Sequence, residues 1–187
     1  MAAEGGPLRY RRFGRTNWQV SEIGYGMWGM AGWTGSDDAE SLRALDRSIA
    51  LGCNFFDTAW AYGDGHSEQL LGKALRAHPD KKLYVASKVP PKNREWPSRR
   101  EFRLDVSYPP EYVFEYVEKS LSNVGVASLD LIQYHTWEDS WLDEERTVRT
   151  IEQLRASGKV RAVGHLMEGD VIGLRFLGRG ERITRSG

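Results

Sequence analysis

The sequence predicts an α/β fold built around a parallel sheet, and three observations carry this prediction. Short apolar runs typical of buried strands alternate with segments whose apolar residues recur at helical spacing. Glycine or proline separates the successive segments. Polar side chains stand where three successive predicted strands end. Because strands that alternate with helices form right-handed βαβ units, both a doubly wound sheet and a (β/α)8 barrel fit this pattern.

The composition is that of a globular protein in a reducing setting. With 187 residues, 40% apolar and 28% charged, the chain is long enough to bury a core as one domain, residues 1–187. Basic and acidic residues both number 26, so no net field attracts nucleic acid or an anionic membrane. A single cysteine excludes an intrachain disulfide and a cysteine-rich metal site, and no metal is expected. No signal-peptide core or membrane-length apolar run is found, so we expect a cytoplasmic location.

The first predicted elements are a β-hairpin and one core strand. Strand-like runs at 8–13 and 18–23 flank the four-residue loop 14–17. Residues 22–27 give the first core strand, and the glycine-rich segment 29–35 follows it as a loop.

A helix is predicted next, with a start signal and a stop signal. Asp37 followed by Glu40 resembles a capping box, and Gly52 ends the helix. The apolar positions between them keep helical spacing: Ala39, Leu42, Leu45 and Ile49.

The alternation then repeats to residue 164. Four more strands are predicted, at 54–59, 83–89, 129–135 and 160–164. Helices are predicted between them, at 67–77, from the proline pair 109–110 to Gly125, and at 145–157.

Side chains suited to catalysis stand at the ends of these strands. Asp57 ends the second core strand, and Tyr62 follows five residues later in a loop closed by glycines. Lys88 and His135 end the next two strands. The carboxyl ends of parallel strands share one edge, where such folds place their chemistry. Each residue also has a structural alternative: Asp57 as a loop cap and Tyr62 as a rim aromatic. Lys88 could equally be a solvated strand end, and His135 a satisfied polar core residue.

Other titratable residues lack this support. His66, His78 and His165 are expected on the surface or in loops. Asp64 and Glu68 are expected to be loop and helix-start charges rather than catalysts.

The tryptophans favour an apolar pocket on the same edge. All but Trp18 fall after a predicted strand and before a helix: Trp28, Trp33, Trp60, Trp96, Trp137 and Trp141. We expect Trp28, Trp60, Trp96 and Trp137 to line a substrate pocket. The alternative is that some of these rings only seal loops onto the rim.

The strand-end motifs together resemble the aldo-keto reductases. They are Phe-Phe-Asp-Thr-Ala-Trp-Ala-Tyr-Gly, Ala-Ser-Lys-Val, Asp-Leu-Ile-Gln-Tyr-His and Gly-Lys-Val-Arg-Ala-Val-Gly, preceded by the hairpin. The resemblance covers residues 8–164. It implies an incomplete (β/α)8 TIM-type barrel of about five βα units at 24–164, with the N-terminal β-hairpin at 8–23.

The resemblance also implies a reaction and the residues that perform it. A small aldehyde or ketone would be reduced by hydride from NADPH, without a metal. Tyr62 would protonate the nascent alkoxide, and Lys88 would favour the phenolate. Asp57 would hold Lys88, and His135 would orient the carbonyl. Cofactor contacts are implied at Gly26, Met27 and Asp57.

The chain departs from the family after Gly164. A Ser-Asn pair is expected there, but the sequence continues His165-Leu166 and ends in a glycine- and arginine-rich tail, 165–187. A complete barrel needs eight units and about 250 residues. We therefore expect a C-terminally truncated member with a divergent, poorly ordered tail, weak NADPH binding and little or no activity. The alternative is a catalytically inactive partial-barrel binding or regulatory protein that associates through its exposed sheet edges.

Overall fold

The structure, a computed structural model, describes residues 8–33, 35–166 and 174–176. Its strands are β1 (Tyr10–Phe13), β2 (Trp18–Ser21), β3 (Tyr25–Gly26), β4 (Phe55–Asp57), β5 (Tyr84–Val89), β6 (Leu129–Tyr134), β7 (Val160–Leu166) and β8 (Leu174–Phe176). Its α-helices are α1 (Asp38–Ala50), α2 (His66–Ala77), α3 (Leu104–Ser107), α4 (Pro110–Val124) and α5 (Glu145–Ala156). Short 3-10 turns span Gly14–Thr16, Trp28–Met30 and Asp139–Asp143.

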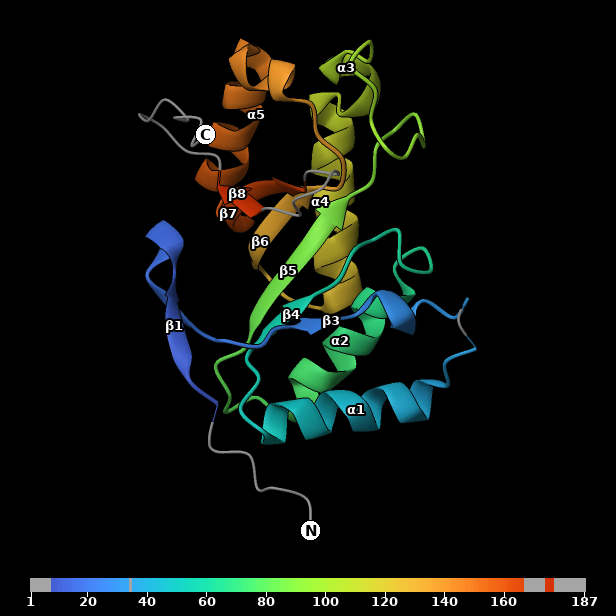
Figure 1. The fold of residues 1–187 in the computed structure, drawn as a ribbon, viewed down its shortest axis with the longest axis vertical. Helices are drawn as coiled ribbons and strands as arrows, with labels where there is room; N and C mark the ends of the chain where they lie inside the picture. The colour runs from blue at the N-terminus through green and yellow to red at the C-terminus, as the bar shows by residue number, and fades with distance from the viewer. Residues whose placement is uncertain (1–7, 34, 167–173, 177–187) are drawn as a thin grey trace.

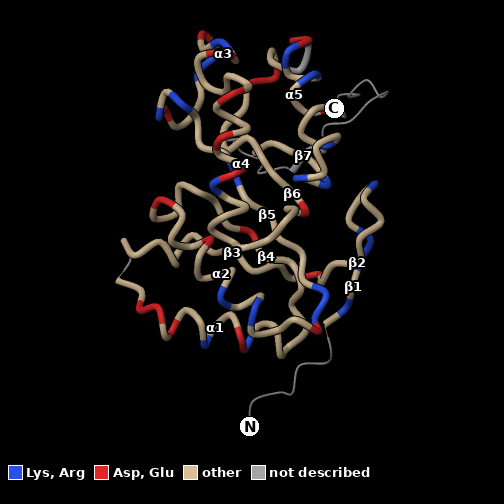
Figure 2. The backbone as a smooth tube through the Cα atoms, turned by 180° about the vertical axis from the view of Figure 1, so that it is seen from behind, with Lys and Arg blue, Asp and Glu red and all other residues tan. Residues whose placement is uncertain are grey.

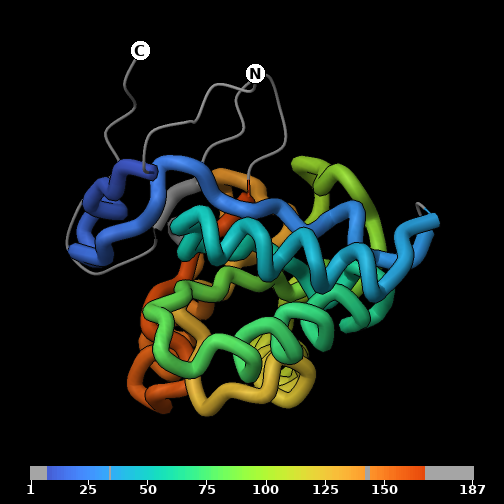
Figure 3. Tube along the Cα trace, turned by 90° about the horizontal axis from the view of Figure 1, so that it is seen from below, coloured from blue at the N-terminus to red at the C-terminus, as the bar shows by residue number. Residues whose placement is uncertain are grey.

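The sheet follows the chain in order, β3-β4-β5-β6-β7-β8, and every pair from β3 to β7 is parallel. Figure 1 shows these strands side by side, with the β1-β2 hairpin standing apart from them. Seen from below, the hairpin lies on the opposite side of the sheet from α4 (Figure 3). This arrangement is part of a (β/α)8 barrel, so the fold class predicted from the sequence is confirmed.

Two apolar clusters form on the two faces of the sheet, because neighbouring residues of a strand point to opposite sides. Phe56 and Val85 face the helices and belong to the larger cluster. Tyr84 and Ala86 face the hairpin, where the ring of Trp18 stacks on Tyr84 with 5.3 Å between centroids. The hairpin therefore covers part of the inner face of the partial barrel.

The hairpin and the first helix agree with the prediction. Phe13 pairs with Trp18 across the four-residue loop. Asp37 caps α1, since its Oδ1 accepts the N–H of Glu40 at 2.9 Å. The first core strand is shorter than predicted, because the N–H of Glu22 bonds the carbonyl of Arg9 and keeps residue 22 in the hairpin.

The end of β7 also differs from the prediction. It runs to Leu166 instead of ending at Gly164, because β8 pairs antiparallel with its last three residues. This pairing was not predictable from local periodicity and covers part of one sheet edge. His165, expected on the surface or in a loop, is instead buried in β7, where its ring stacks on Trp137 at 4.5 Å between centroids. The rest of the predicted divergent tail lies outside the described residues.

Basic and acidic residues are both spread along the described chain (Figure 2), and in the full sequence the two kinds are equal in number. In the part of the chain that the structure covers, no helix is both long and apolar enough to traverse a bilayer. The same residues contain no group of His, Cys, Asp and Glu side chains arranged to hold a metal ion.

Candidate active site

Lys88 is the centre of the candidate site. Its side chain is 2% exposed, and its Nζ lies 2.8 Å from Asp57 Oδ2 and 2.8 Å from the Thr58 carbonyl oxygen. Its Nζ also lies 3.3 Å from Tyr62 Oη. An ammonium has three N–H donors, so each donor of Lys88 has an acceptor. Because Tyr62 Oη accepts from Lys88, its own O–H remains available to donate elsewhere.

Asp57 is fixed from a second side. Its Oδ1 accepts from Gln133 Nε2 at 3.1 Å while its Oδ2 accepts from Lys88. The sheet register explains the contact, since Lys88 pairs with Gln133 across β5 and β6. Sequence reasoning missed Gln133. It stands two residues before His135, and side chains two residues apart along a strand point to the same face of the sheet.

The loop after β4 brings Tyr62 over the lysine. The N–H of Tyr62 bonds the carbonyl of Ala59 at 3.0 Å, which closes a turn. Gly63 follows with φ +69°, and a Cβ there would collide with the carbonyl oxygen of Ala31. Only glycine combines this backbone conformation with so close an approach. The glycine next to Tyr62 is thus a geometric requirement of the site.

His135 completes the group. Its ring lies edge-on to Tyr62, with 5.7 Å between centroids. Burial and the nearby Lys88 charge lower the pKa of His135 to about 3, so the imidazole is neutral at pH 7. Its buried Nδ1 has no hydrogen-bond partner among the residues described. A neutral ring can donate or accept one hydrogen bond at each nitrogen, according to its tautomer.

The structure thus brings Asp57, Tyr62, Lys88 and His135 together, but it separates the four predicted pocket tryptophans. Trp96 lies edge-on to His135, with 5.9 Å between centroids. Trp28 is exposed and contacts Trp33, whose ring in turn meets Tyr62 edge-on at 6.4 Å.

The two other predicted pocket tryptophans pack elsewhere. Trp60 lies edge-on to Tyr116 of α4, with 4.7 Å between centroids. Trp137 is buried in the helix-facing cluster. Their positions after strands predicted that these tryptophans lie in loops. They did not predict whether each ring turns towards the site or towards the helices. Trp33, placed in these loops but left out of the pocket set, is the ring that contacts Tyr62.

The predicted cofactor residues lie beside Asp57. Gly26 pairs with Asp57 in the sheet, and the Met27 N–H bonds the Asp57 carbonyl oxygen at 2.9 Å. A Cβ added at Gly26 would meet no atom within 4 Å, so open space adjoins this backbone. Met27 is fully buried, and its carbonyl oxygen accepts from Ser67 Oγ at 3.2 Å. Open space beside a glycine backbone fits the approach of a flat ring such as a nicotinamide.

One carboxyl near the site is buried. Glu68, expected to be a helix-start charge rather than a catalyst, stands in the first turn of α2 and is fully buried. Its two oxygens accept from Ser87 and Asn123. The sequence gives no signal for this, because the contact joins α2 to β5 and α4.

With this geometry in place, comparison with known proteins defines the class. The chain belongs to the aldo/keto reductase family, whose family model matches residues 22–165. Members of this family are oxidoreductases that act on small carbonyl compounds, and some have been solved with NADPH bound.

Individual relatives agree with this assignment. The chain is 31% identical over 160 residues to the aldo-keto reductase YhdN of Bacillus subtilis, covering 84% of this chain and 46% of that protein. It is 28% identical to the NADH-specific methylglyoxal reductase of Escherichia coli, covering 81% of this chain and 49% of that protein. The chain therefore spans about half the length of the curated relatives it matches.

Solved structures are similar over the same region. The holo form of an aldo-keto reductase from Bacillus halodurans has a TM-score of 0.68 at 27% identity, over 86% of this chain and 50% of that chain. An aldo-keto reductase from Klebsiella pneumoniae in complex with NADPH has a TM-score of 0.65 at 29% identity, over 84% of this chain and 49% of that chain.

Proposed function

We propose that this site reduces an aldehyde or ketone, with NADPH as the hydride donor. The observation that carries the proposal is the contact of Lys88 Nζ with Asp57 Oδ2 at 2.8 Å and with Tyr62 Oη at 3.3 Å. This contact places the positive charge of Lys88 beside the Tyr62 phenol, whose O–H proton remains available for transfer. A family member solved with NADPH and membership of the reductase family support the choice of reaction.

The proposed roles follow from the hydrogen bonds. A carbonyl that accepts hydride at carbon develops negative charge on its oxygen, and an acid within hydrogen-bond reach lowers the barrier. Tyr62 O–H transfers its proton to that oxygen, and the N–H of Lys88 stabilises the phenolate that forms. Asp57, oriented by Gln133, holds the ammonium in place. His135, whose imidazole is uncharged, orients the carbonyl.

The cofactor would rest against the end of β3. Open space adjoins the backbone of Gly26 there, and beside it the Met27 N–H is hydrogen-bonded to the Asp57 carbonyl oxygen. NADPH, when bound, supplies the hydride that the carbonyl carbon accepts. The aromatic side chains of Trp28, Trp33 and Trp96 would border the substrate and exclude water.

Two measurements test the proposal. We expect weak but saturable NADPH binding, followed by nicotinamide fluorescence, and slow NADPH oxidation that depends on an added aldehyde. Tyr62→Phe should lower the oxidation rate by about 10²- to 10⁴-fold, because it removes the general acid. The matched control is Tyr10→Phe, whose hydroxyl lies in the hairpin and donates to the Gly52 carbonyl. Equal rates in the unaltered chain and Tyr62→Phe would rule out the assigned acid.

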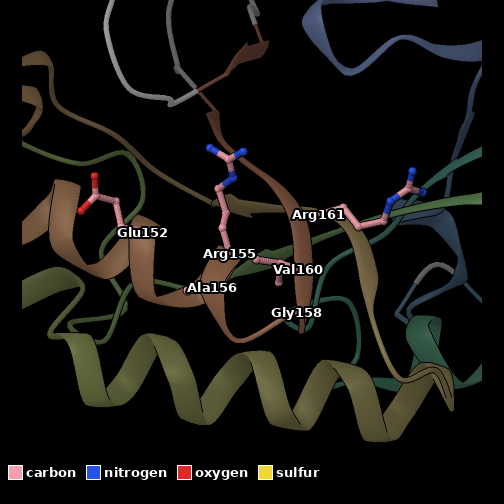
Figure 4. A pocket seen from close by; sticks show the side chains of 6 residues that line it. All are labelled: Glu152, Arg155, Ala156, Gly158, Val160 and Arg161. Carbon is pink, nitrogen blue, oxygen red and sulfur yellow. The ribbon is translucent and has the colours of Figure 1, made fainter.

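An edge of β7 that no described strand fully pairs favours a second candidate function, non-catalytic self-association. Among the described strands, β8 pairs only with the last three residues of β7, and none pairs with that edge at 160–163. A hollow of about 550 Å³ adjoins this segment (Figure 4). It is lined by Glu152, Arg155, Ala156, Gly158, Val160 and Arg161. An unpaired edge can accept a strand from another chain.

Light scattering decides on the second candidate. A second copy bound at this edge predicts a discrete dimer, and Arg155→Glu, which reverses a charge in the hollow, should dissociate it. A monomer at all accessible concentrations would exclude self-association.

A further inference from the structure

A buried carboxyl lies behind the candidate site, and the proposed reaction does not use it. Glu68 is fully buried, although it stands in the first turn of α2. Its Oε1 accepts from Ser87 Oγ at 2.5 Å, and its Oε2 accepts from Asn123 Nδ2 at 2.8 Å. Each carboxyl oxygen therefore has a donor, which is the arrangement that favours a buried charge.

The packing around Glu68 allows little movement. Gly65 has φ +92°, and a Cβ there would overlap the side-chain amide of Asn123. A Cβ at Gly72 would overlap the backbone carbonyl of Val124. Helices α2 and α4 therefore approach each other closely on both sides of the carboxyl. A group enclosed in this way holds its partners at fixed positions.

The contact with Ser87 connects Glu68 to the catalytic candidates. Ser87 directly precedes Lys88 in β5, and successive strand residues point to opposite faces. Ser87 thus faces α2, while Lys88 faces Asp57 and Tyr62. Burial raises the pKa of Glu68, and the hydrogen bonds from Asn123 and Ser87 and the Lys88 charge act in the opposite direction. The Lys88 charge therefore favours the ionised form of the Glu68 carboxyl.

We propose that Glu68 is a positioning residue for Lys88. It fixes the end of β5 to α2 and α4 through Ser87 and, when ionised, places a second negative charge on the helix side of the ammonium. The inference deepens the proposed reductase function and rests on it only for the role of Lys88. The titratable groups that face Lys88 are Asp57, Tyr62 and His135 on the inner side and Glu68 on the helix side. Because Glu68 is enclosed, salt screens its charge less than that of half-exposed Asp57.

The test measures this coupling by NMR on chain labelled at the glutamate side-chain carboxyl carbon. One carboxyl should titrate at a higher pH than the others, and Ser87→Ala, which removes one of its donors, should shift that signal and so assign it to Glu68. Lys88→Met should raise its midpoint further, because it removes the charge that favours the carboxylate. The control is Lys119→Met, a partly exposed lysine of α4 that pairs with Glu115. A midpoint unchanged by Lys88→Met would overturn the proposal.

A second measurement needs no variant of Lys88 and applies if Lys88→Met does not fold. In the unaltered chain, the side-chain carbon signal next to the Lys88 ammonium should change with the same midpoint as the Glu68 carboxyl. A Lys88 signal that is constant through the Glu68 titration would overturn the proposal. Neither measurement uses cofactor or turnover. A chain that reduces no carbonyl but shows the coupling would therefore refute the reductase function and leave the Glu68–Lys88 link intact.

Discussion

At the scale of single residues, hydrogen-bond donors and acceptors are matched around one buried ammonium. Lys88 has three acceptors on three different residues, two of them on the short segment 57–58 that ends β4. Asp57 in turn is held by Gln133. An unpaired charge at 2% exposure would be costly, so the carboxylate and the carbonyl are what allow the lysine to stay there.

The burial of His135 predicts a pH dependence of stability. Its pKa is lowered to about 3 in the folded chain, while an unfolded histidine titrates near 6.5. The unfolded state therefore binds more protons between these values, and the stability that the neutral ring contributes is lost as pH falls from 6.5 towards 3. Near pH 4.5 the loss should be about 2–3 kcal/mol relative to pH 7.

Denaturant unfolding at the two pH values checks this prediction. His135→Asn should show a smaller loss between pH 7 and pH 4.5 than the unaltered chain. His78→Asn is the control, since His78 lies at the surface and pairs with Asp46. The same pH dependence in His135→Asn and the unaltered chain would contradict the assignment.

At the scale of elements, the loop between β5 and α4 is anchored to the site. Tyr108 is buried, and its Oη accepts the Thr136 N–H at 2.8 Å and shares a hydrogen bond with Thr136 Oγ1 at 3.0 Å. Thr136 directly follows His135. In addition, Trp141 Nε1 donates to the Phe102 carbonyl at 3.0 Å. The loop therefore holds the segment that carries the candidate histidine.

Tyr108→Phe should destabilise this segment. The change leaves the buried N–H of Thr136 without its acceptor, at a cost of about 1–3 kcal/mol in unfolding free energy. Chemical denaturation measures the loss, and hydrogen exchange should show faster exchange at Thr136. Tyr10→Phe removes a hydroxyl at an exposed position and should cost less. Slow exchange of the Thr136 amide in Tyr108→Phe would contradict the anchoring role.

Local sequence signals predicted most helices and strands. Where the observed elements differ from the predicted ones, contacts between residues distant in sequence explain the difference. The cap at Asp37 and the stop at Gly125, with φ +76°, mark helix ends that the sequence predicts correctly. The length of β3 and the pairing of β8 depend on contacts with other segments, so the spacing of apolar residues in the sequence does not predict them. The clustering of Asp57, Lys88 and His135 could be predicted because strand ends share an edge, and Tyr62 because its loop directly follows one of them. Gln133 could have been found from its spacing with His135, but Glu68 could not, because its partners lie on other elements.

At the scale of the whole molecule, the hairpin serves as a cover for the inner face of the partial barrel. Trp18 stacks on Tyr84, and the Arg161 guanidinium lies 4.8 Å from the centroid of the Trp18 ring. Arg161 also pairs with Asp130 of β6. The apolar inner cluster is therefore closed by elements from both ends of the described chain.

Trp18→Ala tests this role of the hairpin. Removing a buried tryptophan costs about 3–5 kcal/mol in unfolding free energy, and the uncovered inner face should bind a hydrophobic dye. Trp33→Ala is the control, because Trp33 is exposed and should cost far less stability. Equal losses in the two variants would show that the hairpin does not cover the inner face.

The central claim is that Tyr62, supported by Lys88, protonates a carbonyl oxygen as hydride reaches its carbon. The most direct test supplies NADPH deuterated at the transferring position of the nicotinamide, together with an aldehyde, and weighs the alcohol product by mass spectrometry. We expect one deuterium per product molecule with the unaltered chain, and almost no deuterated alcohol from Tyr62→Phe in the same time. Saturable NADPH binding without deuterated product, or equal product from both chains, would contradict it.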